Sequence, residues 1–267
     1  MSIERRAWEI VLQSIESDLL SGRLRPGDHL PPERALAADL GVGRSSVREA
    51  IRVLEVLGLL RTAVGSGPSA GAIIVALPGG GMSALMRLQV AAQGFPVVDV
   101  VKTRLVLEAS VVTELAEASA LSQSTMDANA SLRPDLATAL QLLGAMESPD
   151  LTEAEFLALD AEFHLALAEA SGNQVVTATM AGLRSAIEAY ARAGASSLAS
   201  WTDTSARLRA EHRAVLAAID AGDAEVARKR VKTHIAGYYA ETQLTPQPTD
   251  HHTAAPGHPA APRERTA

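Results

Sequence analysis

The sequence of 267 residues contains no cysteine, and aromatic residues make up only 3% of it. Without cysteine the chain can form no disulfide, no thiolate metal site and no thiol nucleophile, which suits a reducing compartment. Hydrophobic residues nevertheless make up 47% of the chain. The cores must therefore be packed mainly with Leu, Val, Ile and Ala.

Long apolar runs are also missing. No stretch of about 18 consecutive apolar residues, the length that suggests a membrane helix, occurs in the chain. The charged residues Glu4, Arg5, Arg6 and Glu9 are not followed by the apolar core of a signal peptide. We therefore expect a soluble, cytoplasmic protein without a membrane partner.

An excess of positive charge is absent as well, because the net charge is −7. Residues 1–77 contain nine Arg and nine acidic residues, whereas the remainder contains 15 basic and 22 acidic residues. This balance argues against a protein coated in basic surface for nucleic acid. Any contact with DNA must come from a local cluster of arginines.

The first 77 residues have the pattern of three helices and a β-hairpin. Apolar residues at helical spacing predict helices over about 8–21, 32–40 and 45–57, with Gly22, Gly41 and Gly58 as their stops. Two strand patterns, 59–64 and 72–77, are joined by a glycine-rich turn. This order predicts a winged helix-turn-helix domain over 1–77, with the helix-turn-helix itself at about 36–55.

The rest of the chain shows only helical patterns. Residues 78–81 read as a linker, and 78–96 as a linker with a first connecting helix. Seven helices are predicted, over about 83–94, 97–119, 131–147, 152–170, 174–193, 203–220 and 223–241. We expect a mainly α protein whose second domain, 97–242, is an all-α antiparallel bundle, followed by a disordered tail over 243–267.

The start of the third helix has the chemistry of a DNA reader. In a helix-turn-helix the amino-terminal part of the second helix enters the major groove, and Arg44, Ser45, Ser46 and Arg48 occupy that part here. An Arg fork can grip guanine through two hydrogen bonds, and serine hydroxyls can donate to phosphate. Alternatively, these arginines solvate an exposed face and pair with nearby glutamates.

The spacing of these residues resembles the GntR family of bacterial regulators. The matching segments are LPPERALA at 30–37, LGVGRSSVREAI at 40–51 and LEVLGL at 54–59. The resemblance implies that the DNA-binding residues are Arg34, Arg44, Ser45, Ser46, Arg48 and Gly65 at the wing tip. The wing departs from the family pattern because the segment 65–71 is longer than usual and lacks the aromatic residue.

Four polar residues interrupt the apolar faces of the later helices. Asp160 and His164 are one turn apart on one face, while His212 and His234 each lie on the apolar face of another helix. A lone histidine on such a face is usually a satisfied core residue, but a buried unpaired aspartate would cost several kcal/mol. One carboxylate and three imidazoles suit a divalent ion, with Zn²⁺ preferred and Ni²⁺ or Mn²⁺ as alternatives.

The same region is similar to the FCD effector domain of the FadR subgroup. The similarity rests on Asp160-x-x-Phe163-His164, on Ser-Gly-Asn at 171–173, on Glu211-His212 and on a histidine 22 residues later. It implies that Asp160, His164, His212 and His234 bind the metal. It also implies dimerisation through this domain, for which the helix over 83–94 offers one candidate surface.

Two further residues are candidates for binding an effector. Arg104 lies on the inward face of its helix, where its planar fork could bind a carboxylate, or it could simply pair with Glu108 one turn later. Asn173 matches the family motif, although a role as a helix N-cap is the simpler interpretation.

Together these features predict a transcription regulator rather than an enzyme. As in most of the family, we expect a homodimeric repressor that binds a short palindrome in double-stranded DNA and responds to a small carboxylate. Two alternatives remain: a helical metalloenzyme with an accessory winged-helix module, and a constitutive DNA-binding protein with a structural metal.

Overall fold

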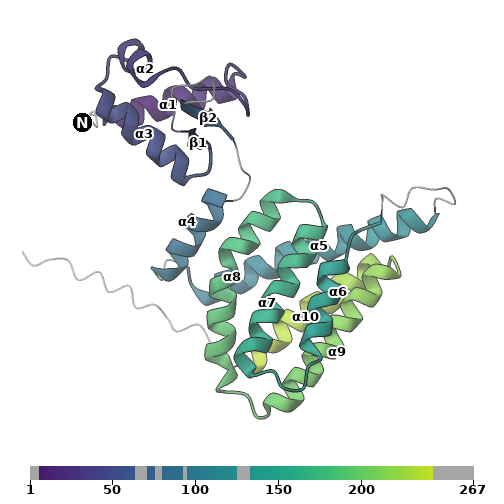
Figure 1. Ribbon diagram of the computed structural model, residues 1–267. Helices are drawn as coiled ribbons and strands as arrows, with labels where there is room; N and C mark the ends of the chain where they lie inside the picture. Colours follow the sequence, from purple (N-terminus) through teal and green to yellow (C-terminus); the bar gives the residue numbers. More distant parts are fainter. Residues whose placement is uncertain (1–5, 64–70, 76–79, 93–94, 125–132, 243–267) are drawn as a thin grey trace, which may run out of the picture.

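The computed structural model describes residues 6–63, 71–75, 80–92, 95–124 and 133–242, drawn in colour in Figure 1. The glycine-rich turn with Gly65 and the predicted disordered tail lie outside the described residues. The described chain contains ten helices and one two-stranded sheet. None of these helices is long and apolar enough to cross a membrane.

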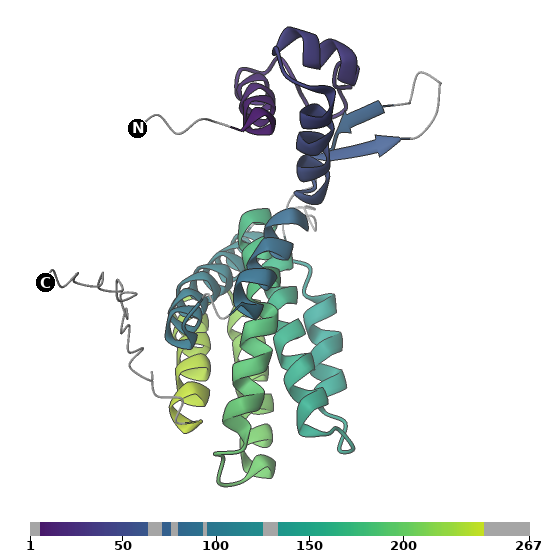
Figure 2. The ribbon, with the colours of Figure 1, turned by 90° about the vertical axis from the view of Figure 1, so that its left-hand side faces the viewer.

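The amino-terminal part is a small helical head with a hairpin (Figure 2). Its elements are α1 (Ala7–Leu20), α2 (Glu33–Asp39), α3 (Arg44–Val56), β1 (Leu60–Ala63) and β2 (Gly71–Ile74). The two strands are antiparallel, with Leu60 opposite Ile74. Gly41 has φ +64° at the bend between α2 and α3, a conformation that favours glycine. This arrangement confirms the predicted winged helix-turn-helix.

One apolar core holds the head together. Its buried members include Val11 and Ile15 of α1, Val47 and Leu54 of α3, and Ile74 of β2. Because these residues fill the inner faces of α1, α3 and the hairpin, the polar face of α3 points away from the core.

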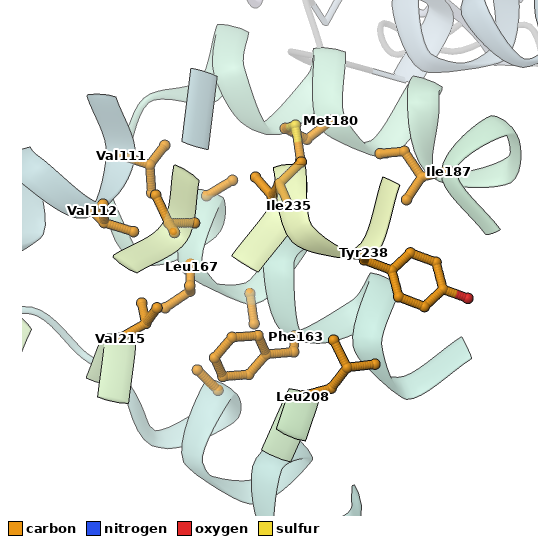
Figure 3. Packing of buried hydrophobic residues seen from close by; sticks show 14 of the residues in the cluster. Val111, Val112, Phe163, Leu167, Met180, Ile187, Leu208, Val215, Ile235 and Tyr238 are labelled. Carbon is orange, nitrogen blue, oxygen red and sulfur yellow. The ribbon is translucent and has the colours of Figure 1, made fainter. Parts of the chain in front are cut away.

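The carboxy-terminal part is the predicted all-helical bundle. Its helices are α4 (Gly80–Ala91), α5 (Val97–Ser124), α6 (Ala137–Met146), α7 (Glu153–Ala170), α8 (Gln174–Ala195), α9 (Trp201–Asp220) and α10 (Ala224–Glu241). Figure 3 shows how Val112, Phe163, Leu208 and Ile235, from four different helices, meet in its interior. Aliphatic residues dominate this core, as the composition predicts.

Some predicted boundaries were wrong. Gly80 and Gly81, assigned to the linker, belong to the first turn of α4, and α5 continues to Ser124 because no helix breaker follows residue 119. The helix predicted over 131–147 begins only at Ala137. Pro134 disfavours helix at the residue before it, and the Asp135 carboxylate accepts a hydrogen bond from the Ala137 amide at 3.0 Å.

The connecting helix α4 packs closely against α8. The buried Ser83 hydroxyl donates to the Ala178 carbonyl at 2.8 Å, tying the two helices together. A Cβ added at Gly182 of α8 would lie 2.5 Å from Met86 Cβ and 3.3 Å from Ser83 Cα of α4. Glycine is therefore required at 182 for this close approach.

We predict that Gly182→Ala destabilises the protein by about 1–3 kcal/mol, because the new methyl group overpacks the α4–α8 contact. The matched control is Gly144→Ala in α6, where an added Cβ meets nothing within 4 Å. That substitution should be neutral or stabilise by about 0.5–1 kcal/mol. Urea unfolding of both variants measures the difference, and equal stabilities would contradict the packing argument.

Candidate functional site

Asp160, His164, His212 and His234 form one buried cluster. Asp160 and His164 come from successive turns of α7, His212 from α9 and His234 from α10. Their exposed fractions are 7%, 2%, 0% and 2%, so the four predicted inward positions are confirmed as buried. The bundle thus brings together residues that are up to 74 positions apart in the chain.

One atom of each side chain points to a common centre. Asp160 Oδ1 lies 3.0 Å from His212 Nε2 and 3.9 Å from both His164 Nε2 and His234 Nε2. The two latter nitrogens are 3.1 Å apart. One ligand atom from each of the four residues lies within 4.8 Å of the others.

Two glutamates orient the outer sides of two of these rings. Glu108 Oε2 lies 2.5 Å from His164 Nδ1, and Glu211 Oε2 lies 2.8 Å from His234 Nδ1. An ionised carboxylate can only accept, so the contact with Glu211 favours a proton on Nδ1 of His234 and leaves Nε2 as the acceptor of that ring. The short contact with Glu108 favours the same tautomer of His164. Such carboxylate–histidine pairs are the usual support of metal-binding histidines.

The protonation states also favour a cation. Burial alone would raise the pKa of Asp160, but the contact with His212 and the neighbouring imidazoles hold it far below its usual value. Burial, reinforced by His234, lowers the pKa of His212 to about 4 even though Asp160 opposes the shift. Burial likewise lowers the pKa of His164. Near neutral pH, Asp160 is therefore an anion beside the uncharged imidazoles of His164 and His212, the state of these ligands that binds a metal.

The cluster passes a geometric test for a divalent ion. Tetrahedral N and O ligands at zinc bond lengths would be about 3.3 Å apart. Four of the six ligand separations are 3.0–3.9 Å, close to this value, and all lie within 4.8 Å. His212 adds a second indication, because neither of its buried ring nitrogens has a hydrogen-bond partner within the described structure. These four residues could hold a metal ion.

Arg104 lies beside this cluster on α5. Its Nε donates to Glu108 Oε1 at 2.5 Å and its Nη1 to the Tyr190 hydroxyl at 3.0 Å. Its buried Nη2 has no hydrogen-bond partner among the described residues. The predicted Arg104–Glu108 pair is therefore present, and one arm of the guanidinium remains unsatisfied.

A small cavity connects Arg104 to the cluster. Arg104, Asp160 and His234 line it together with Tyr190 and Tyr238, and its volume of about 10 Å³ has room for roughly one water molecule. Burial of Glu108 raises its pKa, but Arg104 and His164 outweigh that effect and lower the value to about 2. Glu108 is thus an anion shared between Arg104 and His164.

The exposed start of α3 carries the residues expected to read DNA. Arg44 and Ser45 are exposed and Ser46 is half-buried, within the first turn, where backbone N–H groups have no partner inside the helix. Arg34 on α2 is exposed as well. In the part of the chain that the structure describes, neither Arg34 nor Arg44 forms an ion pair.

Arg48 differs from these arginines because it pairs with Glu33 on α2. Its Nη2 and Nε lie 3.1 Å and 3.2 Å from Glu33 Oε2. Glu55, further along α3, accepts from the Thr62 amide at 2.9 Å, which ties α3 to β1. The Arg48–Glu33 pair bridges the two helices of the helix-turn-helix.

Sequence reasoning missed several supporting residues. Glu211 stood next to His212 in the motif but received no role, and Glu33 and Tyr190 were not considered. Only tertiary contacts identify them, since their partners are 15 to 86 residues away. Asn173, a candidate for binding the effector, acts as the N-cap of α8 by accepting a hydrogen bond from the Val176 amide at 3.2 Å. It does not line the cavity beside Arg104.

Comparisons with known proteins agree with this architecture. Residues 9–68 match the family described as bacterial regulatory proteins, gntR family, and residues 99–237 match the FCD domain. The repressor NanR of Klebsiella aerogenes is 33% identical over 86% of this chain and 83% of its own length. The putative L-lactate dehydrogenase operon regulatory protein of Escherichia coli is 28% identical over 87% and 85%.

Further matches fit the same picture. The Glc operon transcriptional activator of Escherichia coli is 31% identical over 68% of each chain. A structure of Streptococcus agalactiae GntR shares the fold, with a TM-score of 0.54 and 24% identity over 86% of this chain and 97% of that one. The metalloenzyme alternative finds no support in these matches. The chain therefore belongs to the GntR family of bacterial transcription regulators and carries an FCD domain.

Proposed function

We propose that this regulator is a homodimeric repressor whose affinity for DNA is controlled by a small organic acid bound at a divalent-metal site. One observation carries the proposal: Arg104, whose buried Nη2 has no hydrogen-bond partner among the described residues, lines the same small cavity as Asp160 and His234. A buried cationic donor beside a candidate metal site is suited to a carboxylate.

The metal would be held by Asp160, His164, His212 and His234. Two or more nitrogen ligands with one carboxylate favour Zn²⁺, with Ni²⁺ or Mn²⁺ as alternatives. When bound, the ion would supply a Lewis-acidic anchor for an oxygen of the acid. Glu108 and Glu211 keep His164 and His234 in the orientation that this binding needs.

Arg104 would recognise the carboxylate of the acid. Its Nε and Nη1 are already held by Glu108 and Tyr190, so the guanidinium is fixed before any ligand arrives. A donor fixed in advance loses little conformational entropy on binding. The relative named for an L-lactate dehydrogenase operon makes L-lactate a sensible first acid to test.

The size of the cavity explains how binding could become a signal. A space for about one water cannot admit an organic acid unless its walls move. Those walls come from α5, α7, α8, α9 and α10, and α8 is tied to α4 through Ser83. Because α4 stands between the bundle and the head (Figure 1), a shift of α8 would alter how the head is held.

The head would read DNA through α3. Arg44 and Arg48 are the candidates for contacts with bases, and Ser45 and Ser46 for contacts with phosphate. Arg34 and Gly65 complete the proposed set by resemblance to the family. The Glu33 carboxylate restrains Arg48 on this surface, so Arg48 reaches DNA in a defined orientation or after release from that pair.

The metal prediction concerns His212. In His212→Ala, zinc should no longer bind in stoichiometric amount, and the stabilisation that zinc gives the wild type should vanish. That stabilisation is about 2.7 kcal/mol when free zinc is 100 times the dissociation constant. The melting temperature of each variant is measured with zinc and with a chelator. The difference between the two values reports the effect of zinc alone, without the destabilisation caused by the cavity that the substitution creates.

The control for this experiment is His29→Ala, which removes an exposed histidine from the head. It should bind zinc as the wild type does. If His212→Ala kept both the zinc and its stabilising effect, His212 would not be a ligand.

The DNA prediction concerns Arg44. Arg44→Ala should weaken binding to an operator selected from random duplexes by about 1–3 kcal/mol, because a base contact is lost. Binding to random DNA should change little. Arg61→Ala, on an exposed position of β1, serves as the control. Both affinities are measured by fluorescence anisotropy at one salt concentration. If Arg44→Ala weakened binding to the operator and to random DNA equally, Arg44 would not recognise a base.

The effector prediction concerns Arg104. Arg104→Lys keeps the positive charge but removes the planar fork, so affinity for a responsive acid should fall by about 1.5–3 kcal/mol while zinc still binds. Calorimetry on zinc-loaded protein measures both values. If no acid in a panel that includes L-lactate changes operator affinity of the wild type, the protein is instead a constitutive DNA binder.

A further inference from the structure

A second hollow lies on the outer surface between α9 and α10. Its volume is about 540 Å³, within the range of small-molecule sites. The lining residues are Arg207, Ala210, Glu211, Ala214, Val226, Lys229, Arg230 and Thr233. It shares no lining residue with the cavity beside Arg104. We call it the α9–α10 groove.

The charges of the α9–α10 groove favour an anion. Lys229 and Arg230 are exposed and form no ion pair with any described residue, whereas Glu211 is the only acidic residue in its lining. Alanines and a valine make up the apolar part of its wall. A small anion with an apolar body therefore matches this surface, even though the chain as a whole is acidic.

The groove also reaches the metal cluster through one carboxylate. Arg207 Nη1 donates to Glu211 Oε1 at 2.7 Å, and Glu211 Oε2 lies 2.8 Å from His234 Nδ1. The other arm of Arg207 pairs with Glu241, which accepts from the Thr204 hydroxyl at 2.7 Å. Arg207 is thus shared between two carboxylates, and only one of them supports His234.

We propose that the α9–α10 groove is a second ligand site, which binds a small organic anion through Lys229, Arg230 and Arg207 and modulates the metal cluster through Glu211. The coupling rests on the proposed function, but anion binding itself does not. An anion that attracts Arg207 competes with Glu211 for its donors. Glu211 then holds His234 less firmly, or in a different orientation.

Linkage makes the coupling reciprocal, and its size can be estimated from the contact that it uses. If the anion weakens the Arg207–Glu211 contact, it changes zinc affinity, and zinc must change anion affinity by the same factor. Replacing a residue that supports a metal-binding histidine typically changes metal affinity by about 10–100-fold. A loosened contact should produce a smaller change, of about fivefold or more.

Anion binding is tested first, with the metal-free full-length protein, so that the inner cavity lacks its metal. The probes in calorimetry are succinate and glycerol 3-phosphate, which distinguish a dicarboxylate site from a phosphate site. One of them should bind with 1:1 stoichiometry per chain. Lys229→Gln with Arg230→Gln should weaken it by about tenfold or more, because charged hydrogen-bond donors are lost.

The matched control is Arg228→Gln with Lys232→Gln. It removes the same charge from the same helix, at positions that do not line the groove. The control should leave probe affinity unchanged. Equal weakening in both double variants, or no binding of either probe to the wild type, would overturn the site. So would a change of oligomeric state in the groove variant alone, seen by sedimentation, because the surface would then be an interface between copies.

The coupling is tested by zinc competition with a fluorescent chelator, with and without the bound probe. The wild type should show a change in zinc affinity of about fivefold or more, and Glu211→Gln should abolish the change. A wild type that binds zinc and the probe independently would refute the coupling. If zinc did not bind at all, the proposed function would fail, while the metal-free titration would still decide the groove.

Discussion

The bundle is organised around a buried aspartate. Asp160 is only 7% exposed, and an ionised carboxylate in that position is tolerable only where positive charge or hydrogen-bond donors compensate it. Three imidazoles surround it, and burial lowers the pKa values of two of them, His164 and His212. The cluster could also hold a cation at its centre, which would supply the compensation directly.

The support of the cluster extends in two directions. Glu108 joins His164 to Arg104 and the small cavity, while Glu211 joins His234 to Arg207 and the α9–α10 groove. Each glutamate gives one oxygen to a histidine and the other to an arginine. The small cavity and the α9–α10 groove are therefore joined to the same cluster through two similar chains of contacts.

The head and the bundle divide the chemistry of the chain between them. All basic residues of the first 77 positions are arginines, and those of α3 face away from a core of small aliphatic residues. The acidic surplus of the chain resides in the bundle. The net charge gives little long-range attraction to DNA, which is why the proposed recognition depends on close contacts by arginine side chains. Under the proposed function, the bundle would act by changing how the heads of the homodimer are presented to DNA.

Local patterns in the sequence were enough to predict the fold class, the helices of both parts and the burial of Asp160, His164, His212 and His234. Helical periodicity places each of them on an inner face without knowledge of its neighbours. Only the tertiary structure decided which atoms converge, that Arg104 keeps one arm unsatisfied, that Arg48 pairs with Glu33, and that Glu108 and Glu211 support the rings. The reason is physical: periodicity describes one helix at a time, whereas these contacts depend on the rotation and spacing of helices that are far apart in the chain.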